Sequence, residues 1–230
     1  MTPVLVNVLV VLVVGCVVLL ECFGYDAHGE GRRHSVARAR RGLHDSPRAA
    51  GVLGATVVVA LALAVAWGLE DLPLPFTTRL LVLVVALAAV TVADVRSGVV
   101  PYLYLGVLGA VRVVVYGWEL LVDAPATVLV ARGEIVTAVI VVVVLGLVRL
   151  TQRGGLGWGD VWILALLPIF LGPRLALLSI LAAFAVAFGF SLWALISRRK
   201  GRRDSFPLAP AILVGVCAVL LYATFGGATS

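Results

Sequence analysis

The chain has 230 residues, of which 62% are hydrophobic and only 13% are charged, and its mean hydropathy is +1.14. These values lie far outside the range of a soluble domain and predict an integral membrane protein. The net charge of +6 is the ordinary pattern of basic loops beside an anionic leaflet, so we expect a lipid bilayer as the partner and no nucleic acid.

Apolar stretches recur along the whole chain. A membrane-spanning helix needs about 20 mostly apolar residues, and eight stretches come near that length. They lack the two-residue alternation of a barrel strand, so we predict an all-α polytopic membrane protein with eight transmembrane helices. The predicted spans are 3–20, 51–68, 77–93, 101–117, 135–150, 161–172, 174–196 and 206–225. Only Gly172 and Pro173 separate the sixth from the seventh, so these two form either separate helices or one bent or re-entrant segment.

The N-terminal part is expected to be an addition to the rest. No basic segment precedes the first apolar stretch and no small-residue cleavage site follows it, so this stretch is predicted to stay in the protein. Residues 1–69 are predicted to form a transmembrane hairpin with a basic cytoplasmic loop, and residues 70–230 a six-helix core. Six arginines in the loop 21–50 either hold anionic lipid headgroups or act only as an orientation signal.

The distribution of basic residues predicts the orientation. With eight spans, one set of loops and helix ends collects fourteen of the eighteen basic residues. These are Arg32, Arg33, Arg38, Arg40, Arg41, Arg48, Arg96, Arg149, Arg153, Arg198, Arg199, Lys200, Arg202 and Arg203. The opposite side, which includes the predicted loop 118–134, carries acids such as Glu119, Asp123 and Glu134. The positive-inside rule therefore predicts a multi-pass protein of the cytoplasmic membrane with both termini outside.

Two aspartates stand apart from the acids in the loops. Asp94 ends the third predicted span in TVADVRSGVVPYLYL, and Asp160 opens the sixth in RGGLGWGDVWILALLPIFLG. An ionisable group at membrane depth is costly, which makes each of them a candidate functional residue. Both fall at cytoplasmic helix ends, so the bundle is expected to bring them together. The simpler interpretation is that each only caps or terminates a helix, and Asp160 is well placed as an N-cap.

A pair of carboxylates is the catalytic group of an aspartic protease. Two carboxylates that approach closely share one proton. The ionised member takes a proton from water while the neutral member donates to the scissile carbonyl, without a metal or a covalent intermediate. Gly154, Gly155, Gly157 and Gly159 precede Asp160. We expect these glycines to take backbone conformations that other residues avoid and to let an extended substrate approach.

The motifs resemble those of a known family. GWGD at 157–160 matches the GxGD signature of membrane aspartic proteases. DVRSGVVP at 94–101 and GLGWGDVWILALLPIFLG at 155–172 resemble the first and second motifs of the type IV prepilin peptidases and archaeal preflagellin peptidases. FPLAPAILVG at 206–215 resembles the start of their last helix. Presenilin-type proteases are less similar, because Ala93 stands where they have a tyrosine before the first aspartate.

The resemblance covers about 77–225 and implies a six-helix core with Asp94 and Asp160 as catalytic residues. Gly157, Gly159, Pro101, Pro207 and Pro210 fall at the matching positions that would shape the site. The implied activity is that of an aspartic endopeptidase, which removes the short basic leader from prepilin-like or preflagellin-like precursors at the cytoplasmic membrane face.

The chain also departs from the family pattern. Trp162 stands where the family commonly has a lysine, and Tyr102 replaces an asparagine. The four-cysteine insertion of many bacterial members is missing, so N-methyltransferase activity is not predicted. Cys16, Cys22 and Cys217 form no C-x-x-C pair, and we expect neither a metal nor a cofactor.

One rival interpretation belongs to a different class of protein. The chain would then be a proton- or cation-coupled transporter that uses both aspartates, or an inactive scaffold of a pilus or secretion machine. Transport favours carboxylates near the bilayer midplane and broken helices in paired repeats, and no convincing repeat is present. Arg112, inside the fourth predicted span, is expected to extend its charge to the nearer membrane surface.

Overall fold

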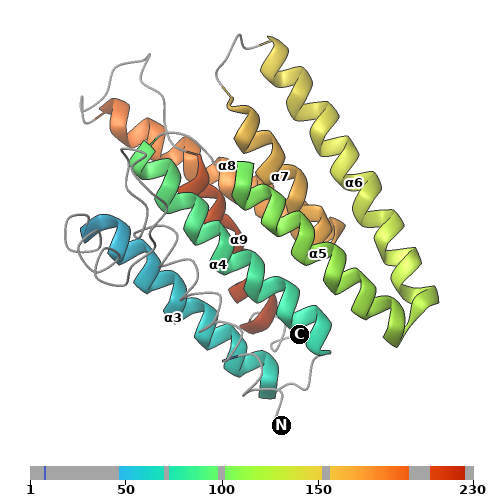
Figure 1. Cartoon of the computed structure of the whole chain (residues 1–230). Coiled ribbons are helices and arrows are strands. Elements are labelled where there is room, and N and C mark those ends of the chain that lie inside the picture. The colour runs from blue at the N-terminus through green and yellow to red at the C-terminus, as the bar shows by residue number, and fades with distance from the viewer. Residues whose placement is uncertain are drawn as a thin grey trace, which may run out of the picture. The chain divides into compact units, whose positions relative to one another are not determined.

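The structure is a computed structural model that describes residues 8, 47–69, 73–97, 102–151, 156–196 and 208–225. These ranges are almost entirely helical, because inside a bilayer each backbone N–H and C=O must find its partner within its own segment. Their seven helices are α3 (Pro47–Leu69), α4 (Leu74–Ser97), α5 (Tyr102–Val122), α6 (Ala124–Thr151), α7 (Trp158–Leu171), α8 (Pro173–Ile196) and α9 (Ala209–Phe225) (Figure 1).

The chain divides into two compact units, Met1–Gly98 and Val99–Ser230. In the first, α3 packs against α4. In the second, α6 packs along α7, α7 along α8 and α8 along α9, while α5 contacts α6 and α7. The division predicted from sequence at 69/70 separates α3 from α4, whereas the structure groups these two helices together.

Four of the described helices contain segments long and apolar enough to cross a membrane. These are Leu74–Val95, Tyr104–Val122, Ala124–Thr151 and Pro173–Trp193, and the shorter apolar segments are Thr56–Trp67, Trp158–Leu171 and Ala209–Phe225. The described residues therefore form a helical membrane protein without reaching the predicted eight full spans. The predicted span 3–20 lies outside the described residues apart from Val8.

Helix α7, which contains most of the predicted span 161–172, is too short to cross the hydrocarbon core when upright. Its 14 residues rise about 21 Å, against about 30 Å of hydrocarbon. Gly172 ends the helix with φ 78° and ψ 165°, and Pro173 begins α8. The backbone N–H of Gly172 donates to the carbonyl of Pro168 at 2.9 Å. Gly172 therefore separates two helices, as one of the sequence-based alternatives has it, and the alternative of one bent helix is wrong.

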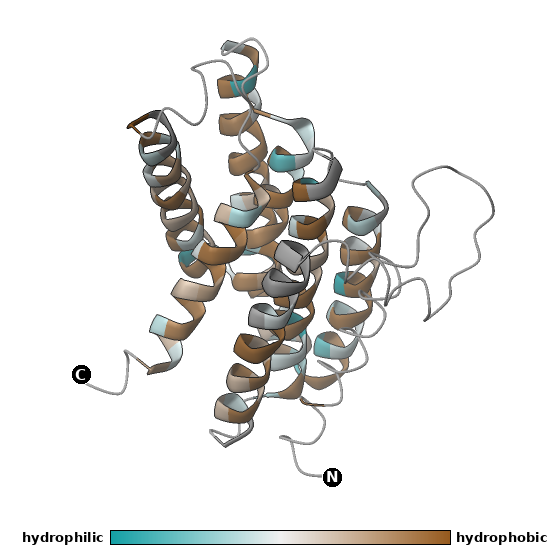
Figure 2. Ribbon diagram, turned by 90° about the vertical axis from the view of Figure 1, so that its left-hand side faces the viewer, coloured by the Kyte–Doolittle hydropathy of each residue, from teal (hydrophilic) through white to brown (hydrophobic). Residues whose placement is uncertain are grey.

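Hydrophobic residues make up much of the described helices, as the brown ribbons of Figure 2 show, and many of them are exposed. On α6 the exposed apolar residues recur at helical spacing, for example at Val136, Val139, Ile140 and Val143. On α8 they include Leu177, Leu181, Phe184 and Phe188. Continuous apolar faces of this kind are stable in contact with lipid rather than water.

The predicted loop 118–134 is wrong for most of its length. Helix α5 continues to Val122, only Asp123 interrupts the helix, and α6 begins at Ala124. The carboxylate of Asp123 accepts a hydrogen bond from the N–H of Ala126 at 3.2 Å, as an N-cap residue does. Because α6 starts eleven residues earlier than predicted, Glu134 lies inside a helix and is fully buried.

Helices α8 and α9 approach closely at a glycine. A Cβ placed on Gly215 would lie 2.6 Å from the backbone nitrogen of Ala183 and 2.9 Å from the carbonyl oxygen of Ser179. Small residues on both helices allow this approach, which is a common way for membrane helices to gain packing energy. The contact holds α9, whose first turn contains Pro210, against α8.

Candidate functional site

Asp160 lies in the first turn of α7, as its third residue. The residue at the N-cap position is Gly157, so Asp160 is not the N-cap itself but caps the helix from the N3 position. Its carboxylate instead accepts a hydrogen bond from the backbone N–H of Gly157, with 3.3 Å between the nitrogen and Oδ2. This is the reciprocal half of a capping box, and a carboxylate here also interacts favourably with the helix dipole. The residue is half-buried.

Gly157 has an ordinary backbone conformation and lies close to the carboxylate of Asp160. Its φ of −70° and ψ of 147° are open to any residue. A Cβ at this position, however, would lie 3.0 Å from Oδ2 of Asp160. Among the described residues only Gly172 has a positive φ, so the expected avoided conformations do not occur at Gly157 or Gly159. Gly154 and Gly155 lie outside the described residues.

A cation from α6 reaches the start of α7. The guanidinium of Arg149, in the last turn of α6, donates to the carbonyl of Leu156. It also lies 4.9 Å from the ring centroid of Trp158, within the range of a cation–π interaction. Both partners are direct neighbours of Gly157. Trp162, one turn after Trp158 on α7, is 46% exposed.

Asp94 lies in the last part of α4 and is 7% exposed. It is inside the helix rather than after it, because α4 continues to Ser97. Asp94 belongs to the first compact unit and Asp160 to the second. Their meeting therefore stays a prediction from sequence. Among the predicted prolines, Pro210 is the second residue of α9, while Pro101 and Pro207 lie outside the described residues.

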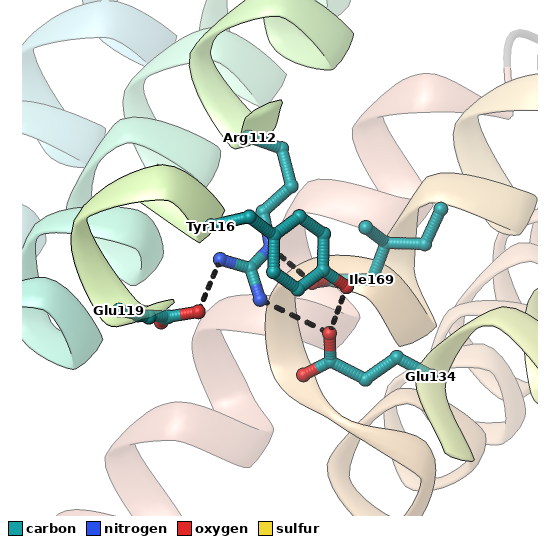
Figure 3. Close-up of polar contacts among 5 residues, drawn as sticks. All are labelled: Arg112, Tyr116, Glu119, Glu134 and Ile169. Carbon is teal, nitrogen blue, oxygen red and sulfur yellow. Dashed lines mark hydrogen bonds and ion pairs between the residues drawn. The ribbon is translucent and has the colours of Figure 1, made fainter. Parts of the chain in front are cut away.

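The second unit contains a buried cluster of charged side chains centred on Arg112 (Figure 3). Arg112 is 1% exposed, and its guanidinium contacts a carboxylate on its own helix and one on α6. Nη1 lies 2.9 Å from Oε2 of Glu119, and Nη2 lies 3.0 Å from Oε2 of Glu134. The hydroxyl of Tyr116 donates to the same oxygen of Glu134, and the Tyr116 ring stacks on the guanidinium with 3.5 Å to its centroid.

The third guanidinium nitrogen of Arg112, Nε, reaches α7. Nε of Arg112 donates to the backbone carbonyl of Ile169 at 2.8 Å. That carbonyl is one of the last four of α7, which have no partner within the helix. Water is absent from hydrocarbon, so an arginine is a suitable partner at this helix terminus. Arg112 thus joins α5, α6 and α7, and the expectation that it extends to the membrane surface is wrong.

Sequence reasoning missed this cluster because it assigned Glu119 and Glu134 to a loop. A usable signal is the spacing of Arg112, Tyr116 and Glu119, which are four and then three residues apart. Such spacing places the three side chains on one helix face. A face of this kind inside an apolar helix indicates a polar partner on a neighbouring helix. The identity of that partner, Glu134, depends on the helix packing.

Metal ligation needs several donors that converge. Among the residues that the structure describes, no group of three or more His, Cys, Asp or Glu side chains is placed to hold a metal ion. In the Arg112 cluster the donors that face the carboxylates are a guanidinium and a phenol. This arrangement stabilises carboxylates by hydrogen bonds and charge.

Comparison with protein-family models, with curated proteins and with solved structures gives no match for this chain. The class that the fold itself defines is a helical membrane protein, with four segments among the described residues that are long and apolar enough to cross a membrane. The two candidate sites within it are the turn that carries Asp160 and the buried cluster around Arg112.

Proposed function

We propose that the protein is a membrane-embedded aspartic endopeptidase that removes the short basic leader from prepilin-like or preflagellin-like precursors. In this proposal Asp94 and Asp160 form the catalytic pair at the cytoplasmic face of the cell membrane. Basic residues near both aspartates in the sequence, Arg96 beside Asp94 and Arg149 and Arg153 before Asp160, support that location by the positive-inside rule. The motif resemblance at 94–101, 155–172 and 206–215 supports the choice of family.

The observation that carries the proposal is the setting of Asp160. Asp160 is half-buried at the start of an apolar helix. Gly157, three residues earlier, has no side chain, and a Cβ there would lie 3.0 Å from Oδ2 of Asp160. In a protease, water and the scissile carbonyl must approach the carboxylate within hydrogen-bonding distance, and a glycine beside the carboxylate favours such an approach.

The proposed reaction follows from the pair. The ionised aspartate removes a proton from water, and the resulting hydroxide attacks the carbonyl carbon of the scissile peptide. The protonated aspartate donates its proton to the carbonyl oxygen, which gives a tetrahedral gem-diol. The intermediate then breaks its carbon–nitrogen bond. The nitrogen receives the proton that the first aspartate took from water, the second aspartate recovers a proton from a gem-diol hydroxyl, and the leader and the mature precursor separate.

The test is cleavage of a panel of prepilin-like and preflagellin-like precursors in membranes. Wild type is compared with Asp94→Asn, Asp160→Asn and Asp123→Asn. The last variant is a matched control, since Asp123 is an exposed acid between α5 and α6. We expect cleavage by wild type and Asp123→Asn, and none by the other two variants at equal accumulation in the membrane. Cleavage by both of them at the wild-type rate would exclude an aspartic mechanism.

A second candidate is a non-enzymatic protein, either a proton- or cation-coupled transporter or an inactive scaffold of a pilus or secretion machine. The buried cluster of Arg112, Glu119 and Glu134 favours transport, because ionisable groups inside membrane helices often belong to ion pathways. Cysteine accessibility at positions 94 and 160 separates the candidates. Protection from both sides, with access that changes on a proton gradient, supports transport, whereas steady access from the cytoplasm supports the peptidase.

A further inference from the structure

Helix α7, which carries Asp160, is held by an arginine near each end. Arg112 donates to the carbonyl of Ile169 in the last turn, and Arg149 donates to the carbonyl of Leu156 just before the first turn. The two arginines come from different helices, α5 and α6. Only the contact of Arg149 lies at the end of α7 that carries the candidate catalytic carboxylate.

The contacts of Arg149 exceed what an orientation signal requires. A charge that only orients a membrane protein needs to face water at the correct side. Arg149 is instead half-buried and directed at two specific partners, the carbonyl of Leu156 and the ring of Trp158. Leu156 is itself buried. The guanidinium therefore connects the end of α6 to residues 156 and 158 at the start of α7.

Gly157, the residue between these two partners, orients the carboxylate of Asp160. Gly157 lies between Leu156 and Trp158, and its N–H donates to Oδ2 of Asp160. Its carbonyl accepts from the N–H of Val161 at 3.2 Å. A shift of Gly157 would therefore move both the donor that orients the carboxylate and the first backbone hydrogen bond of α7. Contacts that hold Leu156 and Trp158 therefore also hold the donor to Asp160 and the first backbone hydrogen bond of α7 in place.

We propose that Arg149 is a positioning residue for Asp160, which holds the 156–158 turn so that the carboxylate keeps its orientation at the start of α7. This inference rests on the proposed peptidase function. Arg149 touches neither substrate nor reacting atoms in this role, and acts through Leu156, Trp158 and Gly157.

Three variants test the inference. Arg149→Met removes the charge and the donors at similar length, and Arg149→Lys keeps a charged donor without the planar fork. Arg132→Met is the matched control, because Arg132 is an exposed arginine on the same helix. All three are compared with wild type as full-length chains in membranes or detergent.

The first readout is amide hydrogen exchange of a peptide that covers 156–163, which does not depend on activity. Loss of one hydrogen bond and one cation–π contact should speed exchange in Arg149→Met by about 5- to 30-fold. Arg149→Lys should remain within about 3-fold of wild type, because it keeps the charge and a donor. Arg132→Met should not differ from wild type. Wild-type exchange in Arg149→Met would overturn the inference.

The second readout is cleavage of a precursor that wild type processes. We expect kcat to fall by about 10- to 100-fold in Arg149→Met, the effect of a displaced catalytic group, with KM nearly unchanged. Arg149→Lys should recover most of the rate, and the unfolding midpoint of Arg149→Met should stay near that of wild type. A purely structural role would instead lower the unfolding midpoint and leave kcat per folded molecule unchanged.

Failure of the inference and failure of the proposed function give different results. Full activity in Arg149→Met beside an inactive Asp160→Asn overturns the positioning role and leaves the peptidase standing. Full activity in Asp160→Asn overturns the peptidase and, with it, the positioning role in catalysis. In that case the exchange measurement still decides whether Arg149 holds the turn.

Discussion

Nη2 of Arg112 on α5 lies 3.0 Å from Oε2 of Glu134 on α6, and both side chains are excluded from solvent. An ion pair in such surroundings contributes less to stability than its Coulomb attraction suggests, because both charges have lost their hydration. Removing one partner is nevertheless costly, because the other charge remains buried without its partner. This asymmetry leads to the first prediction.

Arg112→Met should lower the free energy of unfolding by about 3–5 kcal/mol, because Glu134 and Glu119 lose their shared cation. The measurement is chemical or thermal unfolding of the purified protein in detergent. Arg132→Met provides the control, since this exposed arginine lies two residues from Glu134 on the same helix and should change stability by less than about 0.5 kcal/mol.

A double variant sharpens that prediction. Arg112→Met combined with Glu134→Met should be less destabilised than the sum of the two single variants, because the fully buried Glu134 is no longer left without its cation and only the partly exposed Glu119 remains. Additive losses would mean that the two side chains do not interact as the structure places them.

Gly157→Ala should reduce precursor cleavage by about 10- to 100-fold, because its Cβ would lie 3.0 Å from Oδ2 of Asp160 and displace the carboxylate. Stability should change by only about 1 kcal/mol or less, since alanine fits the backbone angles and replaces glycine at an N-cap position. The measurement is kcat beside the unfolding midpoint. Gly146→Ala on α6, where a Cβ meets nothing within 4 Å, should leave both unchanged or slightly raise stability. Wild-type kcat in Gly157→Ala would show that the space beside Asp160 has no role.

Gly172→Ala should destabilise the protein by about 1–3 kcal/mol, because φ 78° with ψ 165° is open almost only to glycine. Gly172→Asn should be no better, since asparagine tolerates the left-handed helical region but not this ψ. Unfolding in detergent measures both. Gly109→Ala on α5, with open space around its Cβ, is the control. Rescue by asparagine would indicate a different backbone conformation at the junction of α7 and α8.

Gly215→Ala should cost about 1–3 kcal/mol, because the added methyl group would meet the backbone of Ala183 and Ser179 at less than 3.0 Å. Backbone atoms cannot rotate away, so α9 must shift from α8. Gly189→Ala on α8, where nothing lies within 4 Å, is the matched control. Equal stability of the two variants would contradict the close helix contact.

The helices themselves were predictable, because a long apolar run has few stable alternatives inside a bilayer. The first and last residues of these helices were harder to predict. The start of α6 at Ala124 was missed because Arg132 and Glu134 resemble loop residues in a one-dimensional pattern. A buried charge is acceptable inside a membrane helix only when a partner on another helix meets it, and Arg112 is that partner.

The sequence also singled out Gly157 and Asp160 as candidate site residues, but it did not show how the glycine lies beside the carboxylate. The prediction gave Gly157 an unusual backbone, whereas the structure shows an ordinary backbone and a crowded Cβ position. The contact of Arg149 with Leu156 and Trp158 left no signal, because basic residues at helix ends are explained equally well by membrane orientation.

The sequence by itself determined that this is a helical membrane protein and which carboxylates stand near helix ends, because length and hydropathy are properties of neighbouring residues. Only the tertiary structure decided that Arg112 is buried between Glu119 and Glu134, and that Gly215 contacts the backbone of α8. These features depend on residues from different helices, and the free energy of a buried charge or of a close backbone contact is set by the packing around it.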